Sequence, residues 1–436
     1  MNKFISLIIV TLSFIFVLVT EIKASDICEK EEKYSQAWYY NNCDGNILQS
    51  TDQKPIKSHL KQNPKVGYPY NSDEIPQDAN PDYKILKHYL KKSINPNQWG
   101  NRGIFKIKKT KNFKKFEFDL RKDENVIQQL NKTALLSYLE YVDGKIVVDE
   151  ITPKDRFGKI FKNKTKHPSH SVGKSIISYI TGHAICKGYI SGINHKLNDW
   201  PILEKTLFYN QPLINPLNMA SGDHKIIKTK GGGEFINSNR WVNDPSIQSI
   251  MENEFKDSKP AKIKYSYSNV NTNLVASYVL YKMGHKDFKK MLNEIFVDKV
   301  GIEYDMIIKK QRKAKKKETT LTYGMHITRY DFLRIAVAML DDWNNDTCEG
   351  KYLKSLYENR IDKGFRPKDN TKGMSNSNHY AGQFYVGMSG KGDVPIFIMS
   401  GHGGQNIVID FENKKITAIL AIHRNYDWMK LVHNKF

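Results

Sequence analysis

The sequence predicts an α+β domain in which strands from both ends of the domain form one antiparallel sheet, with helices between them. Two apolar segments joined by Asp143 and Gly144 predict a β-hairpin over residues 135–150, because this pair is a favoured two-residue turn. Near the C-terminus, short turns separate three further strand-like segments, at residues 395–399, 406–410 and 416–421.

The region between these strands is predicted to be mainly helical and rich in loops. A helix begins at about Val172, where isoleucines recur at helical spacing, and it ends at Gly188. Two further helical patterns cover residues 271–283 and 328–340. We therefore expect a helical subdomain over about residues 190–380.

The N-terminus is predicted to be a secretory signal peptide over residues 1–25. Lys3 provides a basic start, residues 4–19 are apolar, and Ala24 or Ser25 follows as a small residue at the cleavage edge. An uncleaved membrane anchor is the alternative, although the apolar run is shorter than the ~20 residues that span a bilayer. We expect a periplasmic or secreted protein.

After the predicted signal peptide, a change in composition at about residue 125 divides the chain into two regions. Residues 26–125 are polar and rich in Lys, Asn and Pro, so we expect them to be an N-terminal extension that wraps a larger domain, with a role that the sequence leaves open. The larger domain covers residues 126–436.

Charge and composition limit the possible partners. The 436 residues carry a formal net charge of +22, and a 39% share of hydrophobic residues is enough for a folded core. Such a charge suggests nucleic acid or an anionic surface. Because export is predicted, no nucleic-acid partner is expected, and an anionic envelope polymer or a membrane surface remains.

Four cysteines suit an oxidising compartment. Cys28 and Cys43 lie close together in a polar segment and are predicted to form a disulfide. Cys186 lies in an apolar helical stretch, which favours a buried free thiol, and a bridge to Cys348, expected in a loop, is the alternative. No Cys-x-x-Cys pattern occurs, so no zinc site of that kind is predicted.

Ser171 and Lys174 form a Ser-x-x-Lys pattern at the start of the apolar helix. Residues three apart share a helix face, so the amine can reach the hydroxyl, and the helix N-terminus favours negative charge on that oxygen. A serine needs such a base to act as a nucleophile. A simple helix cap is the alternative for Ser171, and Ser58 and Lys61 match the same pattern by composition alone.

Two further motifs follow in order: Tyr-Ser-Asn at 267–269, before a predicted helix, and His-Gly-Gly-Gln at 402–405, between predicted strands. Alone, the second would predict only a glycine turn. Together the three motifs resemble the serine β-lactamase and penicillin-binding protein superfamily. The resemblance is closer to its class C β-lactamase-related branch, which includes esterases and 6-aminohexanoate-dimer hydrolases.

The resemblance covers about residues 126–436. It implies a β-lactamase/transpeptidase-like fold and a serine hydrolase that cleaves a small-molecule amide or ester without a metal or organic cofactor. His402 stands where β-lactamases and transpeptidases usually carry the lysine of Lys-Thr-Gly, which weakens the case for β-lactam turnover. The alternatives are a D,D-peptidase acting on peptidoglycan and a non-catalytic envelope-binding relative.

The resemblance and the chemistry together imply roles for the motif residues. Ser171 would form the acyl-enzyme while Lys174 and Tyr267 transfer protons, and which of the two is the base stays open. Burial would favour the neutral amine that a base requires. The backbone amides of Ser171 and Gln405 would bind the oxyanion. The substrate and oxyanion residues would be Asn269, His402, Gly403, Gly404 and Gln405.

Overall fold

The structure is a computed structural model, and it divides the chain into two units, residues 1–52 and residues 53–436. The predicted signal peptide and the predicted Cys28–Cys43 pair lie outside the described residues. All described residues belong to the second unit; they are 75, 81–96, 104–226, 246–309, 321–363 and 377–436.

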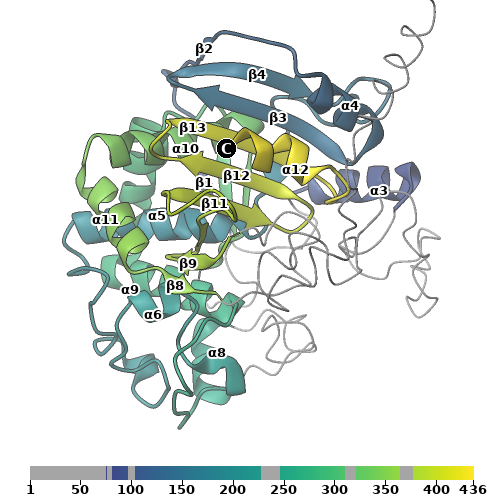
Figure 1. Ribbon diagram of the computed structural model, residues 1–436. Coiled ribbons are helices and arrows are strands. Elements are labelled where there is room, and N and C mark those ends of the chain that lie inside the picture. The colour runs from purple at the N-terminus through teal and green to yellow at the C-terminus, as the bar shows by residue number, and fades with distance from the viewer. Residues whose placement is uncertain (1–74, 76–80, 97–103, 227–245, 310–320, 364–376) are drawn as a thin grey trace, which may run out of the picture. The chain divides into compact units, whose positions relative to one another are not determined.

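Within these ranges, nine strands form one large sheet. They are β2 (Glu117–Phe118), β3 (Leu135–Val142), β4 (Lys145–Ile151), β8 (Ile361–Asp362), β9 (His379–Ala381), β10 (Phe384–Val386), β11 (Ile396–Gly401), β12 (Gln405–Asp410) and β13 (Lys415–Ala421). Their order is β2-β4-β3-β13-β12-β11-β10-β9-β8, and each neighbouring pair except β2 and β4 is antiparallel. Because β3 pairs with β13, the predicted sheet built from both ends of the domain is confirmed (Figure 1).

Most helices lie between these strands in the chain, α3 precedes them and α12 follows them, and helices pack on both faces of the sheet. They are α3 (Tyr83–Ser93), α4 (Glu124–Lys132), α5 (Val172–Cys186), α6 (Ile214–Leu217), α8 (Ile247–Asn253), α9 (Asn269–Asn293), α10 (Arg329–Asn344), α11 (Cys348–Glu358) and α12 (Trp428–Leu431). Shorter 3₁₀ or π turns are η1 (Pro201–Leu203), η2 (Asp223–Lys225), η3 (Glu294–Lys299) and η5 (His433–Lys435). The helices predicted to begin at about 172, 271 and 328 therefore exist as α5, α9 and α10.

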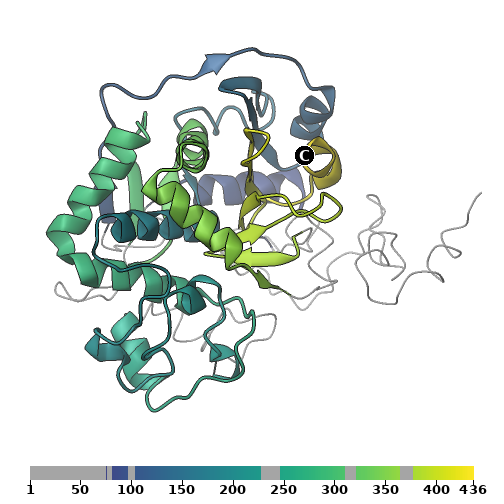
Figure 2. The same cartoon turned by 60° about the vertical axis from the view of Figure 1, so that its left-hand side comes forward.

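Alternation along the strands divides the apolar side chains between two cores. On β11, Phe397 and Met399 belong to the larger core cluster, while Ile396 and Ile398 belong to the smaller one. Helices α5 and α10 pack on the first face, and α4 and α12 contribute to the core on the second face. Figure 2 gives a second view of this layered arrangement. Because α5 is covered by the sheet, α9 and α11, it is buried on almost all sides.

Helix α9 consists of two helical parts, and the first ends where predicted. The expected end at Met283 is followed by Gly284, whose φ of 70° and ψ of 163° interrupt the helix. Beyond this kink Phe288 and Met291 are buried, so the second part has its own apolar face and continues to Asn293. The glycine therefore ends the first helical part, and a second part that was not predicted follows it.

A second, smaller sheet was not predicted, because its strands are only two to four residues long. Its strands are β1 (Ile104–Ile107), β5 (His167–Pro168), β6 (Met306–Lys309) and β7 (Met325–Ile327), in the antiparallel order β1-β6-β7-β5. Strand β1 comes from the region expected to be an extension, and α3 from the same region adds Leu86 and Leu90 to the larger core. The helix α3 and the strand β1 of this region thus pack with the domain.

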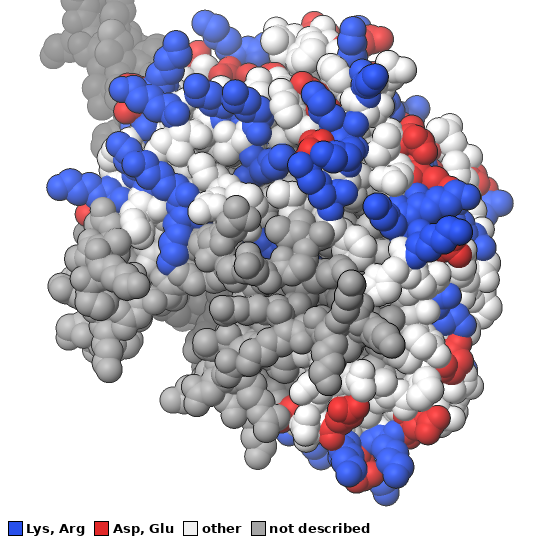
Figure 3. All heavy atoms as spheres, turned by 180° about the vertical axis from the view of Figure 1, so that it is seen from behind, with Lys and Arg blue, Asp and Glu red and all other residues white. Residues whose placement is uncertain are grey.

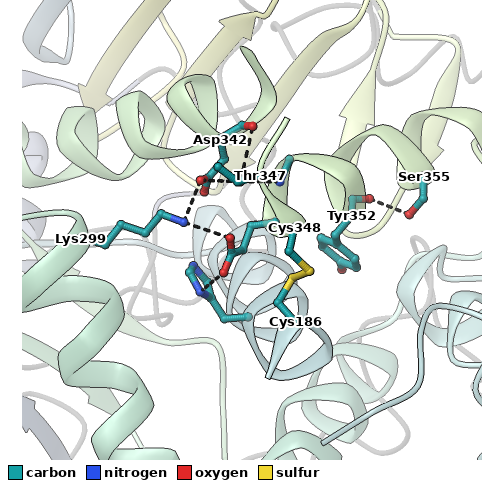
Figure 4. The surroundings of a disulfide bond; sticks show 10 residues. Cys186, Lys299, Asp342, Thr347, Cys348, Tyr352 and Ser355 are labelled. Carbon is teal, nitrogen blue, oxygen red and sulfur yellow. Dashed lines mark hydrogen bonds and ion pairs between the residues drawn. A yellow bond between two sulfur atoms is a disulfide. The ribbon is translucent and has the colours of Figure 1, made fainter. Parts of the chain in front are cut away.

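The cysteine prediction needs a correction. Cys186 and Cys348 form a disulfide between the end of α5 and the start of α11, so the free thiol favoured for Cys186 is wrong (Figure 4). The two helices pack together and bring the Cα atoms to 5.8 Å, within disulfide range. Cys348 is the first residue of a helix and not part of a loop. In the described part of the chain, no helix has the length and apolar character to span a bilayer.

Candidate active site

Ser171 lies directly before α5 and does not cap it. Its φ of −72° and ψ of −11° are already helical, and its side chain makes no capping hydrogen bond. Lys174 Nζ instead lies 3.1 Å from Ser171 Oγ and donates a hydrogen bond to it. The preceding residue, His170, has a φ of 45°, which turns the chain from β5 into the helix. The simple helix-cap interpretation is therefore wrong.

Lys174 is buried, with an exposed fraction of 1%. Its Nζ lies 3.4 Å from the centroid of the Tyr323 ring and 5.0 Å from that of the Tyr267 ring. A buried amine is costly without polar or aromatic partners, and these two rings and the Ser171 hydroxyl supply them. The amine is thus held beside one hydroxyl in a largely aromatic environment.

Tyr267 precedes α9 and shares the Ser171 hydroxyl with Lys174. Burial, together with the neighbouring Tyr385 and Tyr380, raises the pKa of Tyr267 well above its ordinary value, and a hydrogen bond with Ser171 partly opposes this shift. Tyr267 is therefore a neutral phenol near neutral pH. It can donate or relay a proton at the same oxygen that Lys174 contacts.

Asn269 is the first residue of α9, and its Oδ1 accepts a hydrogen bond of 2.9 Å from the Tyr323 hydroxyl. Asn269 is predicted to hold Lys174 or a substrate amide, and this stays a prediction. One link from Asn269 to Lys174 runs through Tyr323, whose ring contacts the amine and whose hydroxyl contacts the amide.

Sequence reasoning missed Tyr323, which belongs to none of the three motifs. One signal was present within the first motif, at Gly173. A Cβ on Gly173 would lie 1.9 Å from the Tyr323 carbonyl oxygen, so only glycine allows this close approach. The glycine of Ser-x-Gly-Lys therefore marks a backbone contact, although it does not identify the partner.

The third motif forms the turn between β11 and β12. Gly401 and Gln405 are paired in register, and the turn between them places Gly403 and Gly404 at φ of 82° and 91°. The glycine-turn interpretation is thus correct for its geometry. The turn also lies beside the first motif, because a Cβ on Gly401 would be 2.9 Å from the Ser169 carbonyl oxygen.

His402 and Gln405 have well-defined side-chain partners. His402 Nε2 donates to the carbonyl of Ile75 at 3.1 Å, and its ring packs 5.7 Å from that of His170. Gln405 Nε2 donates to the Ala421 carbonyl at 3.0 Å, so this side chain joins β12 to β13. The structure thus brings His402 beside the residue that precedes Ser171, and residue 75 of the N-terminal region beside His402.

Two buried histidines near this site are weak bases. His167 on β5 and His326 on β7 are both buried, which lowers the pKa of each to about 3. Both are therefore neutral near neutral pH and accept protons poorly. Within the described ranges, no group of three or more His, Cys, Asp or Glu residues is arranged to hold a metal ion.

Comparisons with known proteins identify the fold. No family model and no curated protein sequence matches the chain. Among solved structures, a protein from Bacillus anthracis assigned as a 6-aminohexanoate-dimer hydrolase is similar, with a TM-score of 0.61 at 13% identity, covering 87% of this chain and 95% of the other. A Bacteroides dorei protein assigned as a β-lactamase has a TM-score of 0.54 at 12% identity, covering 72% and 96% of the two chains.

A third similar structure is an octameric penicillin-binding protein homologue from Pyrococcus abyssi. It has a TM-score of 0.51 at 12% identity and covers 72% of this chain and 74% of the other. Likeness at such identities concerns the fold. The fold prediction is therefore confirmed: this chain has the fold of the serine β-lactamases and penicillin-binding proteins.

Proposed function

We propose that this chain is an exported serine hydrolase that cleaves an amide or ester bond through an acyl-enzyme on Ser171. The observation that carries the proposal is the 3.1 Å contact between Lys174 Nζ and Ser171 Oγ at the start of α5. A serine hydroxyl becomes a nucleophile only with a base in hydrogen-bond reach. The low pKa of His167 makes it a poor candidate, which favours Lys174.

The proposed reaction starts with attack of Ser171 Oγ on the acyl carbon, while the neutral amine of Lys174 takes the hydroxyl proton, either directly or through Tyr267, which gives its own proton to the amine as it accepts the one from serine. Tyr267, as a neutral phenol, can then donate its proton to the leaving nitrogen or oxygen and regain one from the Lys174 ammonium. Water then attacks the acyl-enzyme with the same groups acting in reverse. A positioned acid or base typically contributes about 10²–10⁴-fold to such a rate.

The oxyanion of the tetrahedral intermediate would be bound by the backbone N–H groups of Ser171 and Gln405. The N–H groups of Val172 and Gly173 donate to the carbonyls three residues earlier, at Ser169 and His170. The N–H of Ser171 therefore precedes the hydrogen-bonded part of the helix. Loss of one such donor commonly costs about 2.7–4 kcal/mol.

Labelling tests this proposal. A fluorophosphonate probe and a fluorescent penicillin are each incubated with the folded protein, and the modified peptide is identified by mass spectrometry. We expect the fluorophosphonate to modify Ser171 and the Ser171→Ala variant to stay unlabelled. Stable labelling by penicillin as well would favour the D,D-peptidase. If neither probe modifies folded protein, the non-catalytic envelope-binding relative is the better description.

We further propose a small-molecule amide or ester as the substrate. The similar Bacillus anthracis structure is assigned as a 6-aminohexanoate-dimer hydrolase, and His402 replaces the usual lysine. Profiling of aryl esters and short amides, with Ser171→Ala as the blank, would separate the two bond types. An equal rate for Ser171→Ala on every substrate would contradict the proposal.

Export to the periplasm or outside the cell is part of the proposal. The Cys186–Cys348 disulfide supports it, because such bonds persist in oxidising compartments. Lys and Arg outnumber Asp and Glu over the upper part of the face in Figure 3, which supports contact with an anionic envelope polymer or membrane surface. Mass spectrometry of the mature N-terminus tests export, and an intact Met1 in a cytoplasmic fraction would contradict it.

A further inference from the structure

Gln383 occupies an unusual position in the turn between β9 and β10. The turn residues Gly382 and Gln383 have φ values of 52° and 71°, so both lie in the left-handed region. Such two-residue turns favour glycine or asparagine, because a longer side chain is strained there. Gln383 is also buried, with an exposed fraction of 3%. A strained and buried residue at a turn indicates that its surroundings require it.

Every polar group of Gln383 has a partner. The side-chain Oε1 accepts from the Thr272 hydroxyl at 2.6 Å, and Nε2 donates to the carbonyls of Pro216 and Leu217, both at 2.9 Å. The backbone N–H donates to the Leu217 carbonyl at 2.9 Å. The backbone carbonyl accepts from the Ser175 hydroxyl at 2.6 Å. One residue therefore makes hydrogen bonds to three separate segments.

Two of these segments carry the candidate catalytic groups. Ser175 follows Lys174 on α5, and it is buried. Thr272 lies three residues after Asn269 on α9, which puts the two on one face of that helix. Gln383 therefore connects the helix of Ser171 and Lys174 to the helix that follows Tyr267.

The third segment, residues 216–219, contacts the backbone next to Tyr267. Leu217 ends α6 and is followed closely by Met219. The Met219 carbonyl accepts from the N–H of Ser266 at 2.7 Å, and its sulfur lies 3.3 Å from the N–H of Ser268. These two residues flank Tyr267, so the segment that Gln383 holds also holds the backbone around the phenol.

We propose that Gln383 is a positioning residue that sets the placement of Tyr267 relative to Ser171 and Lys174. None of its hydrogen bonds is made to these three residues. It acts by joining α5, α9 and the 216–219 segment through one buried side chain and one backbone unit. The inference rests on the proposed function, because it assumes that Ser171 is the nucleophile.

The test measures how fast a fluorophosphonate modifies Ser171. Thr272→Val removes the hydroxyl that Gln383 Oε1 accepts from, Thr272→Ser restores it, and Gln383→Met removes all side-chain hydrogen bonds at similar volume. The matched control is Ser178→Ala, because Ser178 is also buried on α5 and its hydroxyl bonds to Tyr352 at 2.8 Å, on α11. Thermal unfolding and the pH profile of labelling are recorded for each variant.

We expect Thr272→Val and Gln383→Met to slow labelling about 10- to 100-fold at temperatures well below unfolding, since small misplacements of reacting groups have effects of this size. Their pH profiles should also change, because the phenol and the amine would no longer share the serine oxygen. Thr272→Ser should label within twofold of the wild type. Ser178→Ala should lose stability but keep the wild-type rate and profile.

The outcomes separate the two proposals. If wild-type protein is not labelled at Ser171, the proposed function fails and the inference fails with it. If the wild type is labelled and Thr272→Val labels at the same rate with an unchanged pH profile, only the inference fails. Equal slowing by Thr272→Val and Ser178→Ala would likewise overturn it. Should Gln383→Met not fold, the Thr272→Val and Thr272→Ser pair decides the question.

Discussion

Lys174 Nζ lies 3.4 Å from the centroid of the Tyr323 ring, closer than a typical cation–π contact. The hydroxyl of the same tyrosine donates a hydrogen bond to Asn269 Oδ1. Tyr323 therefore links a residue of the first motif to a residue of the second. Neither the Ser-x-x-Lys nor the Tyr-Ser-Asn pattern includes it.

Replacing Tyr323 tests its two contacts separately. Tyr323→Phe keeps the ring and loses the bond to Asn269, so we expect labelling of Ser171 to slow less than about 10-fold, the worth of one ordinary hydrogen bond. Tyr323→Leu also removes the ring and should slow labelling further, by up to about 30-fold more if the contact is worth about 2 kcal/mol. Tyr352→Phe, which loses a buried hydroxyl bond elsewhere, is the control. Equal rates for the Phe and Leu variants would show that the ring does not hold the amine.

Replacing Lys174 should reduce activity without reducing stability. Lys174→Met keeps the volume but removes the amine, so we expect labelling to fall by about 10²–10⁴-fold. The amine is almost completely buried, and an apolar residue at such a site is often neutral or stabilising. The midpoint of thermal unfolding should therefore stay the same or rise. Wild-type labelling of this variant would show that Lys174 is not the base.

The Cys186–Cys348 disulfide should matter for stability and little for the reaction. It closes a loop with a sequence separation of 162 residues, for which about 2–5 kcal/mol of stabilisation is expected. It lies at the far end of α5, about 22 Å along the helix from Ser171. We expect the Cys186→Ala/Cys348→Ala variant to unfold at a lower temperature and to label normally below it.

A reductant provides the matching control. It should lower the unfolding temperature of the wild type by more than that of the double variant, since only the wild type has this bond to lose. His183 on α5 lies 2.8 Å from Glu349 on α11, and Lys299, shown beside the disulfide in Figure 4, lies 3.2 Å from the same carboxylate. These ion pairs remain after reduction, so the helices should stay associated. A large loss of labelling on reduction, well below unfolding, would contradict this prediction.

Asp223 should make stability depend on pH. It is fully buried, which raises its pKa from 3.8 to about 6, although Asn271 donates a hydrogen bond to Oδ2 at 2.9 Å. Because the folded pKa lies above the unfolded one, the associated stability is fully present below about pH 3.8 and is lost as the pH rises through about 6. Asp223→Asn should unfold at a higher temperature than wild type at pH 8 and at a similar one at pH 4. Asp298→Asn, at an exposed site, is the control.

The unfolding temperatures at pH 4 and pH 8 together show whether ionisation of Asp223 is the cause. An equal shift of Asp223→Asn at both pH values would mean that the amide changes packing or hydrogen bonding and that ionisation is not responsible. A shift at pH 8 for Asp298→Asn as well would indicate a general effect of net charge.

The larger sheet could be predicted because its strands carry strong local signals. Asp143 and Gly144 adopt the positive φ values that their turn requires, and β11 to β13 alternate between two cores. Strands β5, β8, β9 and β10 could not be predicted, because two or three residues are too few to show a period. These short strands form because they pair with adjacent strands of the folded chain.

The site could be predicted only as far as its motifs extend. Ser171, Lys174 and Tyr267 lie together because helix geometry and motif order relate them. Tyr323 and Gln383 lie in segments with no spacing relation to these motifs, so only tertiary packing reveals them. Cys186 was misjudged for a similar reason: its apolar neighbours suggested burial, whereas its place at the end of α5 brings it next to α11.

The pairing of β3 with β13 has a consequence for biosynthesis. Leu139 on β3 pairs with Ala418 on β13. Strand β3 is therefore synthesised long before its partner strand, which lies near the end of the chain. A growing chain already contains Ser171 and Lys174 but has no completed sheet to support α5. Hydrolytic competence should therefore require the complete chain, including its last strand.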